Sequence, residues 1–254
     1  MDLETRANIR MKTLFLFTLF LTLPALVSAE TVNYDELVDR NGVFYKKFTN
    51  VPFTGKTTGK GQGTIKRGKK VGPWIFYYKS GQIDGSGDFK DGKEHGPWKW
   101  YHGNGKLSAK GNYKDGKPHG LFESYHENGQ LSAKGNYKDG KLNGLSESYR
   151  ENGQLKDKTT YKDGKEHGPF EWYHENGQLE VKGNNKDREW HGVVESYREN
   201  GQLWEKANYK DGKRHGLVVV FHDNGQWKEK WDYKDGQIIG VTCFSEIGEE
   251  ISCR

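Results

Sequence analysis

A 24-residue unit recurs along most of this chain and limits what it can fold into. Its eight copies start at Ile65, Phe89, Tyr113, Tyr137, Tyr161, Asn185, Tyr209 and Tyr233. Only 32% of the residues are hydrophobic while 30% are charged, too few apolar residues to fill the core of a compact globule of this size. The repeat therefore predicts a thin, elongated array in which each copy contacts its nearest neighbours.

Each copy contains two turn signals and two short segments suited to strands. Asp115-Gly116 and Asn128-Gly129 are hairpin dipeptides whose residues tolerate a positive φ. The segments between them, residues 120–126 and 131–138, are too short and too bounded by glycine to form helices. We expect an all-β fold: an elongated antiparallel β-meander of tandem 24-residue hairpins, forming a single-layer twisted ribbon.

The repeat pattern divides the chain after its N-terminal 29 residues into two parts. Residues 30–64 are a degenerate lead-in expected to form an N-terminal cap, and residues 65–254 hold the eight copies. The last copy, residues 233–254, is one residue short between Gly240 and Gly248, as a C-terminal capping repeat can be.

Residues 1–29 are predicted to include a secretory signal peptide. A basic start at Arg10 and Lys12 precedes an apolar run, residues 13–23, and Val27-Ser28-Ala29 is typical of a cleavage site. The mature chain would begin at Glu30, and Met11 is an alternative translation start. We therefore expect an exported protein, periplasmic or secreted, with a retained signal anchor as the alternative.

The formal net charge of +5 does not favour binding to nucleic acid. Lysines alternate with acidic residues instead of forming blocks, so the long-range field is weak. We expect no nucleic-acid partner.

The repeat resembles a known family. Residues 209–216 (Tyr-Lys-Asp-Gly-Lys-Arg-His-Gly), followed by Phe221 and Asn224-Gly225, are similar to the MORN repeat. The second glycine expected after His-Gly is replaced by bulky residues such as Trp98 or Phe122, which resembles the bacterial MORN-variant group, often labelled YwqK-like antitoxins. The resemblance implies a β-hairpin array with a binding or scaffolding role and no catalysis; an antitoxin-like neutralising partner of a toxin is one alternative.

The two faces of the predicted strands differ. An aromatic residue recurs at Tyr77, Tyr101 and every later copy, which predicts a structural ladder. The opposite face varies between copies, as a partner surface would, and its partner-binding candidates are Trp74, Phe76, Trp98, Trp100, Phe122, Phe170, Trp172 and Trp190. We expect a non-enzymatic scaffold that binds another protein through this face. The alternative is that this face packs against another part of the ribbon or against a second copy of the chain. For Trp190, sequence drift between copies is the alternative to a binding role.

Lysines at the turns suggest a second kind of partner. Each turn carries two lysines around an aspartate, as at Lys114, Lys117, Lys138, Lys141, Lys210 and Lys213. Because the aspartate offsets part of the charge, attraction to an anionic surface is small per repeat. Binding to a membrane surface or an envelope glycan is the alternative function.

The nine histidines form two columns that do not predict a metal site. Successive members, such as His95 and His119 or His102 and His126, lie one repeat apart, roughly 9.6 Å. Nitrogens that share a zinc ion lie about 2 Å from it. We expect the first column to pack at the His-Gly turn and the second to be a solvated strand end. Glu123 and Glu147 are expected to be solvated and balanced by lysine, and no catalytic residue, metal or cofactor is predicted.

Cys243 and Cys253 are the only cysteines, and they flank the Ile247-Gly248 turn. In an oxidising compartment a disulfide closing the last hairpin is expected, with two free thiols as the alternative.

Overall fold

The computed structural model describes residues 30–253, so the predicted signal peptide lies outside the described residues. Within these residues one short 3-10 helix accompanies 22 strands. The elements are β1 (Thr31–Asn33), η1 (Tyr34–Glu36), β2 (Leu37–Arg40), β3 (Val43–Lys46), β4 (Gly55–Thr58), β5 (Gly61–Lys66), β6 (Lys69–Tyr77), β7 (Ile83–Lys90), β8 (Lys93–Tyr101), β9 (Leu107–Lys114), β10 (Lys117–Tyr125), β11 (Leu131–Lys138), β12 (Lys141–Tyr149), β13 (Leu155–Lys162), β14 (Lys165–Tyr173), β15 (Leu179–Lys186), β16 (Glu189–Trp190), β17 (Gly192–Tyr197), β18 (Leu203–Lys210), β19 (Lys213–Phe221), β20 (Trp227–Lys234), β21 (Gln237–Phe244) and β22 (Glu250–Ile251).

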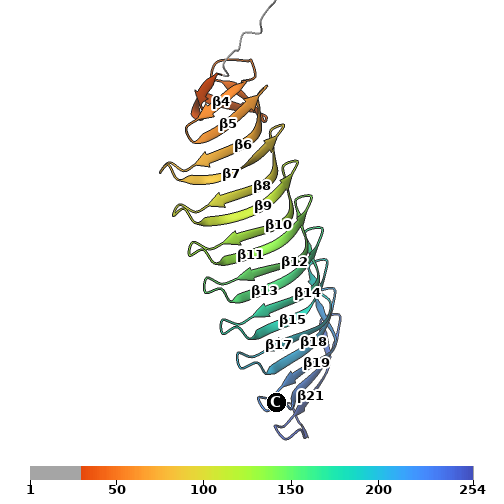
Figure 1. Ribbon diagram of the computed structural model, residues 1–254. Helices are drawn as coiled ribbons and strands as arrows, with labels where there is room; N and C mark the ends of the chain where they lie inside the picture. Colours follow the sequence, from red (N-terminus) through yellow and green to blue (C-terminus); the bar gives the residue numbers. More distant parts are fainter. Residues whose placement is uncertain (1–29, 254) are drawn as a thin grey trace, which may run out of the picture.

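Twenty of these strands form one long sheet in meander order, as Figure 1 shows. From β4 onward each strand pairs antiparallel with the next, except that β16 and β17 are successive segments that both pair with β15; this confirms the predicted all-β meander. One pair differs from the prediction: β1 runs parallel to β4, with Thr31 opposite Lys56. The chain between them forms η1 and the separate β2–β3 hairpin, and such a crossover returns the strand in the same direction.

The two predicted turns have different geometries. Asp115 and Gly116 both have a positive φ, 53° and 79°, and Lys114 pairs with Lys117 across a two-residue turn, as the dipeptide predicts. At Asn128-Gly129 only the glycine has a positive φ, 93°. The Asn128 side chain instead accepts a hydrogen bond from the Gln130 amide (2.8 Å), so a wider loop joins these strands.

A recurrent glycine with a positive φ bends the strands that follow an Asp-Gly turn, except β21, where Gly240 lacks this φ. Gly120 has a φ of 85°, and no heavy atom lies within 4 Å of where a Cβ would be. The glycine is therefore required by its backbone conformation, not by lack of space. The strand pairing slips beside this glycine, between Pro118 and Phe122.

The two faces of the sheet carry different side chains. The face of Trp74, Trp98 and Phe170, here called the aromatic face, holds the largest buried side chains. The opposite face, here called the tyrosine face, carries Tyr125, Glu123 and their counterparts in the other repeats. In one layer of strands, burial on the aromatic face comes from neighbouring repeats instead of a second sheet.

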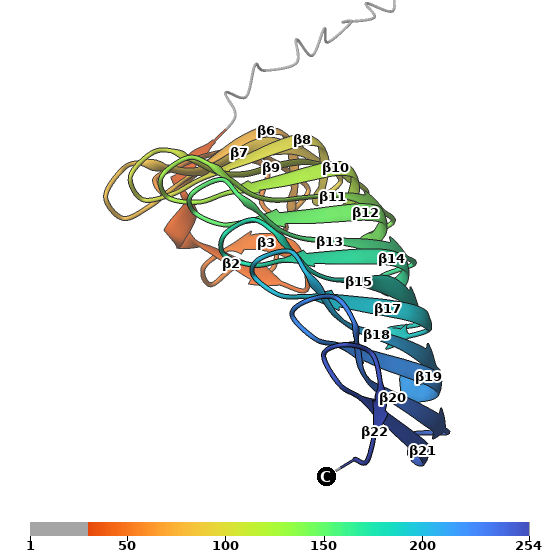
Figure 2. The ribbon, with the colours of Figure 1, turned by 90° about the horizontal axis from the view of Figure 1, so that it is seen from below.

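The N-terminal segment covers the beginning of the aromatic face. Tyr34 and Phe44, from η1 and β3, pack with Trp74 and Phe76, with ring centroids of Tyr34 and Trp74 5.8 Å apart. Figure 2 shows β2 and β3 set against one face of the main sheet. Residues 30–64 thus supply a small hairpin and the first strands, and shield the first repeat.

At the other end, β20 and β21 form the last full hairpin. The short strand β22 returns along β21, and a disulfide joins Cys243 to Cys253, whose Cα atoms are 5.3 Å apart. The tail is thereby held against the end of β21, at Cys243 and Phe244.

Candidate partner-binding face

Three of the eight predicted partner-binding residues are buried, and the prediction is wrong for them. Trp74, Trp98 and Phe170 are only 1%, 4% and 1% exposed. Their rings lie over residues without large side chains on the preceding strand. The Trp98 ring, for example, occupies the space that a Cβ on Gly87 would need. They belong to the core because small neighbours let large rings lie flat on the sheet.

The other five remain accessible to different degrees. Phe76, Trp100, Phe122 and Trp190 are half-buried, and Trp172 is 37% exposed. Trp100 lies between Trp98 and Phe122, with centroid separations of 5.7 and 5.5 Å, so repeats are joined by a continuous row of rings. This row extends from Trp74 to Phe122 and is joined edge-on by Phe89 and Tyr113.

A second row of rings lies further along the face. Phe170 packs with Trp172 (5.2 Å) and with Trp190 (5.7 Å), and Trp190 meets Tyr209 edge-on (5.0 Å). Trp190 therefore has a packing role in this row.

A polar stretch separates the two rows. Between Phe122 and Phe170, Ser146 and Ser148 stand at the positions of Trp98 and Trp100. Thr159 and Asp157 lie opposite them on the next strand, and Ser148 hydrogen-bonds to Asp157. Thr159 is 6% exposed. The aromatic face thus presents two apolar patches with hydroxyl and carboxylate groups between them.

The tyrosine face is held together by a repeated ion-pair motif. Lys110 contacts Glu123 (2.6 Å), Tyr125 donates to the same carboxylate (3.1 Å), and the ammonium lies 5.7 Å from the tyrosine ring centroid. The hydrogen bond from Lys110 holds the pKa of Glu123 below its usual value. The lysine balance predicted for Glu123 and Glu147 is present, but their side chains are only 20% and 13% exposed, so they are largely shielded, not solvated.

Both histidine columns link neighbouring repeats. In the first, at the turn edge, His215 Nδ1 lies 3.4 Å from Asp235 of the next repeat. In the second, His126 Nε2 donates to the Tyr149 carbonyl (2.9 Å), a contact 23 residues along the chain. The second column was predicted to be a solvated strand end, and that is wrong because these side chains replace water at the next repeat's backbone. Arg150 and Arg198 make the same contact in their repeats.

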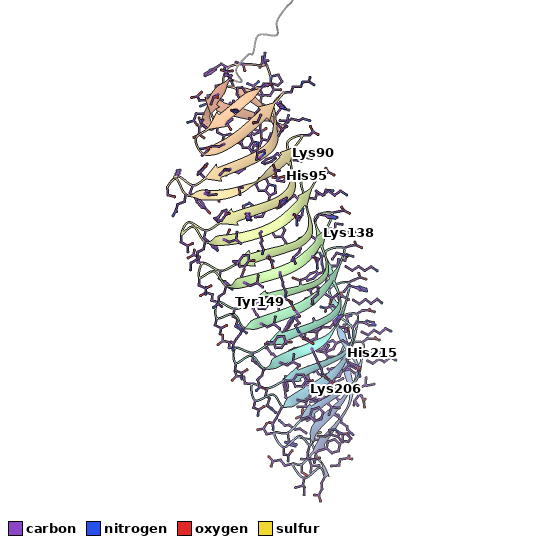
Figure 3. All side chains as sticks on the ribbon, viewed as in Figure 1. Lys90, His95, Lys138, Tyr149, Lys206 and His215 are labelled. Atoms are coloured by element: carbon purple, nitrogen blue, oxygen red, sulfur yellow. A yellow bond between two sulfur atoms is a disulfide. The ribbon has the colours of Figure 1, made fainter. Side chains whose placement is uncertain are left out.

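The lysine-bearing turns lie along one lateral edge. Figure 3 shows Lys90, Lys138, His95 and His215 on this edge. The lysines of the turns are exposed, with an exposed aspartate between each pair.

Residues 30–253 contain no cluster of three His, Cys, Asp or Glu side chains arranged for a metal ion. Nor does any helix in this part of the chain have the length and apolarity to cross a membrane.

Comparison with known proteins identifies the repeat. The model of the MORN repeat variant matches seven segments of the chain: residues 70–91, 94–115, 118–139, 142–163, 166–187, 190–211 and 214–235. This match does not support the narrower YwqK-like antitoxin assignment. No curated protein matches the chain. Because the seven segments cover more than half of the 254 residues, the chain belongs to the MORN repeat variant family.

Proposed function

We propose that this protein is a non-enzymatic scaffold that binds another protein along its aromatic face. MORN repeats are compatible with scaffolds that bind proteins or membranes. The observation in favour of a protein ligand lies within the chain itself: Tyr34 and Phe44 already dock on Trp74 and Phe76. The same face continues beyond this cap with rings that are only partly covered.

The candidate contact residues are now Trp100, Phe122, Trp172 and Trp190. They are anchored by stacking on buried rings, so little side-chain entropy is lost when a partner covers them. Tryptophan and tyrosine are also the residues enriched at interface hot spots. A segment with exposed aromatic or aliphatic side chains, similar to the β2–β3 hairpin, fits such a surface.

The test compares two triple variants of the chain in quantitative co-purification from the native host. One carries Trp100→Ser, Phe122→Ser and Trp172→Ser on the aromatic face. The control carries Leu121→Ser, Leu145→Ser and Leu217→Ser on the tyrosine face, where these leucines are 43–48% exposed.

The aromatic variant should lose its partner, with affinity reduced at least about 30-fold, since hot-spot truncation costs about 2 kcal/mol or more. The control should retain it. Circular dichroism and melting temperature establish that both variants fold. Equal recovery of the partner by both folded variants would refute the proposal.

A membrane or glycan surface is the second candidate, favoured by the single lysine-bearing edge. Sedimentation with anionic vesicles at low and high salt distinguishes it, because contacts of this kind weaken as salt screens the lysines. Absence of sedimentation at low salt would count against it. Identification of the captured protein tests the antitoxin alternative, in which the partner would be a toxin.

Export is part of the same proposal, with the protein acting in the periplasm or outside the cell. The disulfide between Cys243 and Cys253 supports it, because disulfides persist in oxidising compartments. Fractionation of the native host, with mass spectrometry of the mature N-terminus, provides the test. A cytosolic protein that retains residues 1–29 would contradict export.

A further inference from the structure

One column of strand positions carries charged side chains next to the aromatic rings. It is formed by the second residue of eight strands, β6, β8, β10, β12, β14, β16, β19 and β21: Lys70, Glu94, Pro118, Leu142, Glu166, Trp190, Arg214 and Ile238. Four of these residues are charged. Glu166 differs from the other three in what surrounds it.

The other three charges have opposite charges nearby on the same face. Burial lowers the pKa of Lys70 while the Glu94 carboxylate acts in the opposite direction, so these two charges lie close enough to attract each other. Arg214 donates to both carboxylate oxygens of Glu205 (2.7 Å each). Since Glu205 is only 8% exposed, this pair is largely withdrawn from solvent. Each charge is therefore balanced from within the chain.

Glu166 lacks such a balance. Within residues 30–253, no lysine, arginine or histidine forms an ion pair with it, and the adjacent His167 lies beside Asp187 instead. The Asn185 amide donates to the Glu166 carboxylate (3.1 Å). Asn185 is 5% exposed, and no donor in the described part of the chain reaches its carbonyl oxygen. Two acceptors, one of them negatively charged, are thus left without a cation.

Aromatic rings lie on both sides of these acceptors. Trp190 lies opposite Asn185 in the β15–β16 pair, and its ring centroid is 6.0 Å from that of Trp172. Tyr161 lies opposite Glu166 in the β13–β14 pair. Burial and the Glu166 charge raise the pKa of Tyr161, so the carboxylate and the phenol are close. The carboxylate therefore lies in an aromatic setting.

The first repeat shows how rings in this setting hold a cation. Lys70, at the position of Glu166, places its ammonium 4.7–5.2 Å from the centroids of five rings. Two of these rings, Tyr34 and Phe44, belong to the docked N-terminal segment. There the column supplies the cation and the docked segment adds rings. At Glu166 the column supplies an anion, so a docked segment has to bring the cation.

We propose that the partner bound along the aromatic face places an arginine side chain against Trp172 and Trp190, with its guanidinium on the Glu166 carboxylate. This inference rests on the proposed function, because it names the chemistry of that partner. Arginine fits better than lysine, since a planar guanidinium stacks on a ring while its N–H groups donate to a carboxylate. Asn185 is a positioning residue whose amide holds the carboxylate in place.

The neighbouring charges are compatible with a cationic ligand. The lysines of β13 and β15 that form ion pairs do so with glutamates of the tyrosine face, on the other side of the sheet. A hollow beside Trp172 contains as many cations as anions, being lined by Arg150, Lys156, Asp157 and Glu180. The unbalanced charge next to the tryptophans is therefore that of Glu166.

The test uses residues 30–254 and short peptides of the form acetyl-Leu-X-Leu-amide, in which X is arginine, glutamine or glutamate. The indole N–H signals of Trp172 and Trp190, assigned by single Trp→Phe substitutions, report binding in NMR titrations. The arginine peptide should shift both signals and bind at least about tenfold more tightly than the glutamine peptide. The glutamate peptide should bind no better than the glutamine peptide.

A matched pair of variants tests the carboxylate. Glu166→Gln should weaken binding of the arginine peptide about tenfold, while glutamine still accepts from the Asn185 amide. Glu94→Gln, at the same position of the second repeat, should change neither affinity because its charge already faces Lys70. Equal binding of the arginine and glutamine peptides would overturn the proposal. So would unchanged binding by Glu166→Gln, or the absence of any shift at millimolar peptide.

Co-purification from the native host separates this inference from the proposed function. Glu166→Lys, shown to be folded by circular dichroism, should lose the partner as the aromatic triple variant does. A partner that is lost from the triple variant but retained by Glu166→Lys would leave the proposed function intact and exclude the arginine contact. Equal recovery of the partner by every folded variant would exclude both.

Discussion

Trp98 lies flat against Gly87 of the neighbouring strand. A Cβ built on Gly87 would come within 2.3 Å of two atoms of the Trp98 ring, closer than packed atoms approach. The Trp98 indole N–H donates to the Asp88 carbonyl (3.1 Å), which keeps the ring in this position. The same relationship joins Gly63 to Trp74, so it is a repeated means of burying a large ring in a single layer of strands.

Gly87→Ala should therefore destabilise the chain by about 1–3 kcal/mol, because the added methyl displaces Trp98. Urea unfolding monitored by tryptophan fluorescence measures the change. Gly103→Ala is the matched control: no heavy atom lies within 4 Å of its added methyl. An effect of equal size at both glycines would show that ring packing is not the cause.

His126→Ala should lower the free energy of unfolding by about 1 kcal/mol, since the Tyr149 carbonyl loses its donor. His126→Arg should retain most of the stability, because Arg150 makes the equivalent contact with the Tyr173 carbonyl (2.8 Å). Chemical unfolding of the two variants and the wild-type chain provides the comparison. Equal destabilisation by alanine and arginine would contradict a role as a link between repeats.

Glu195 should contribute to stability in a pH-dependent way. Hydrogen bonds from Lys182 (2.8 Å) and Lys206 (2.9 Å) lower the pKa of Glu195 to about 2. Because the folded pKa lies below the ordinary value of 4.5, the stabilisation is present above pH 4.5 and is lost as the pH falls from 4.5 to 2.

Glu195→Gln should therefore be less stable than wild type by about 1 kcal/mol at neutral pH, and the difference should disappear near pH 2. Melting temperatures across this range measure it. Glu199→Gln, at an exposed carboxylate, should change little at any pH. A Glu195→Gln difference that does not vary with pH would contradict the ion-pair explanation.

The contribution of Lys70 to stability should also depend on pH, but in the alkaline range. Its ammonium lies 4.7–5.2 Å from the ring centroids of Tyr34, Phe44, Trp74, Phe76 and Phe89. Burial lowers the pKa of Lys70 from 10.5 to about 8, so the folded state holds the proton less tightly than the unfolded state. Stability from this residue should rise as the pH increases from 8 to 10.5.

The wild-type chain should thus gain stability relative to Lys70→Met as the pH is raised from 8 towards 10. Thermal melts of both proteins at each pH give the difference and cancel the contribution of Tyr34. Lys69→Met, at the exposed neighbouring lysine, should show no such trend. If the difference in stability between wild type and Lys70→Met does not change with pH, the prediction is wrong. The aromatic rings would then stabilise the charged ammonium as well as water does.

Much of the fold follows from local sequence. The 24-residue period, the Asp-Gly dipeptides and the recurrent Gly120 position predict the hairpins correctly, because positive φ angles at a two-residue turn restrict the residues that fit there. The Asn128 turn was less predictable, since a side-chain hydrogen bond, not a second positive φ, closes the loop.

The candidate site required the tertiary structure. In the sequence, Trp98 and Trp172 look alike, but Trp98 is 4% exposed and Trp172 is 37% exposed. The difference depends on which residues the neighbouring strands place beside each ring: Gly87 leaves room beneath Trp98, whereas Trp172 lies opposite Asp157 and Val181. A signal for this was present in the glycine that recurs opposite the tryptophan position at Gly63, Gly87 and Gly111.

The repeating hairpin, its length and the separation of a constant face from a variable one could be predicted from the sequence alone, because these depend on residues close together in the chain. The three-dimensional structure was needed to show which aromatic rings are buried and how the histidines join one repeat to the next. Those properties depend on contacts between neighbouring strands and between neighbouring repeats, which no single copy of the repeat encodes.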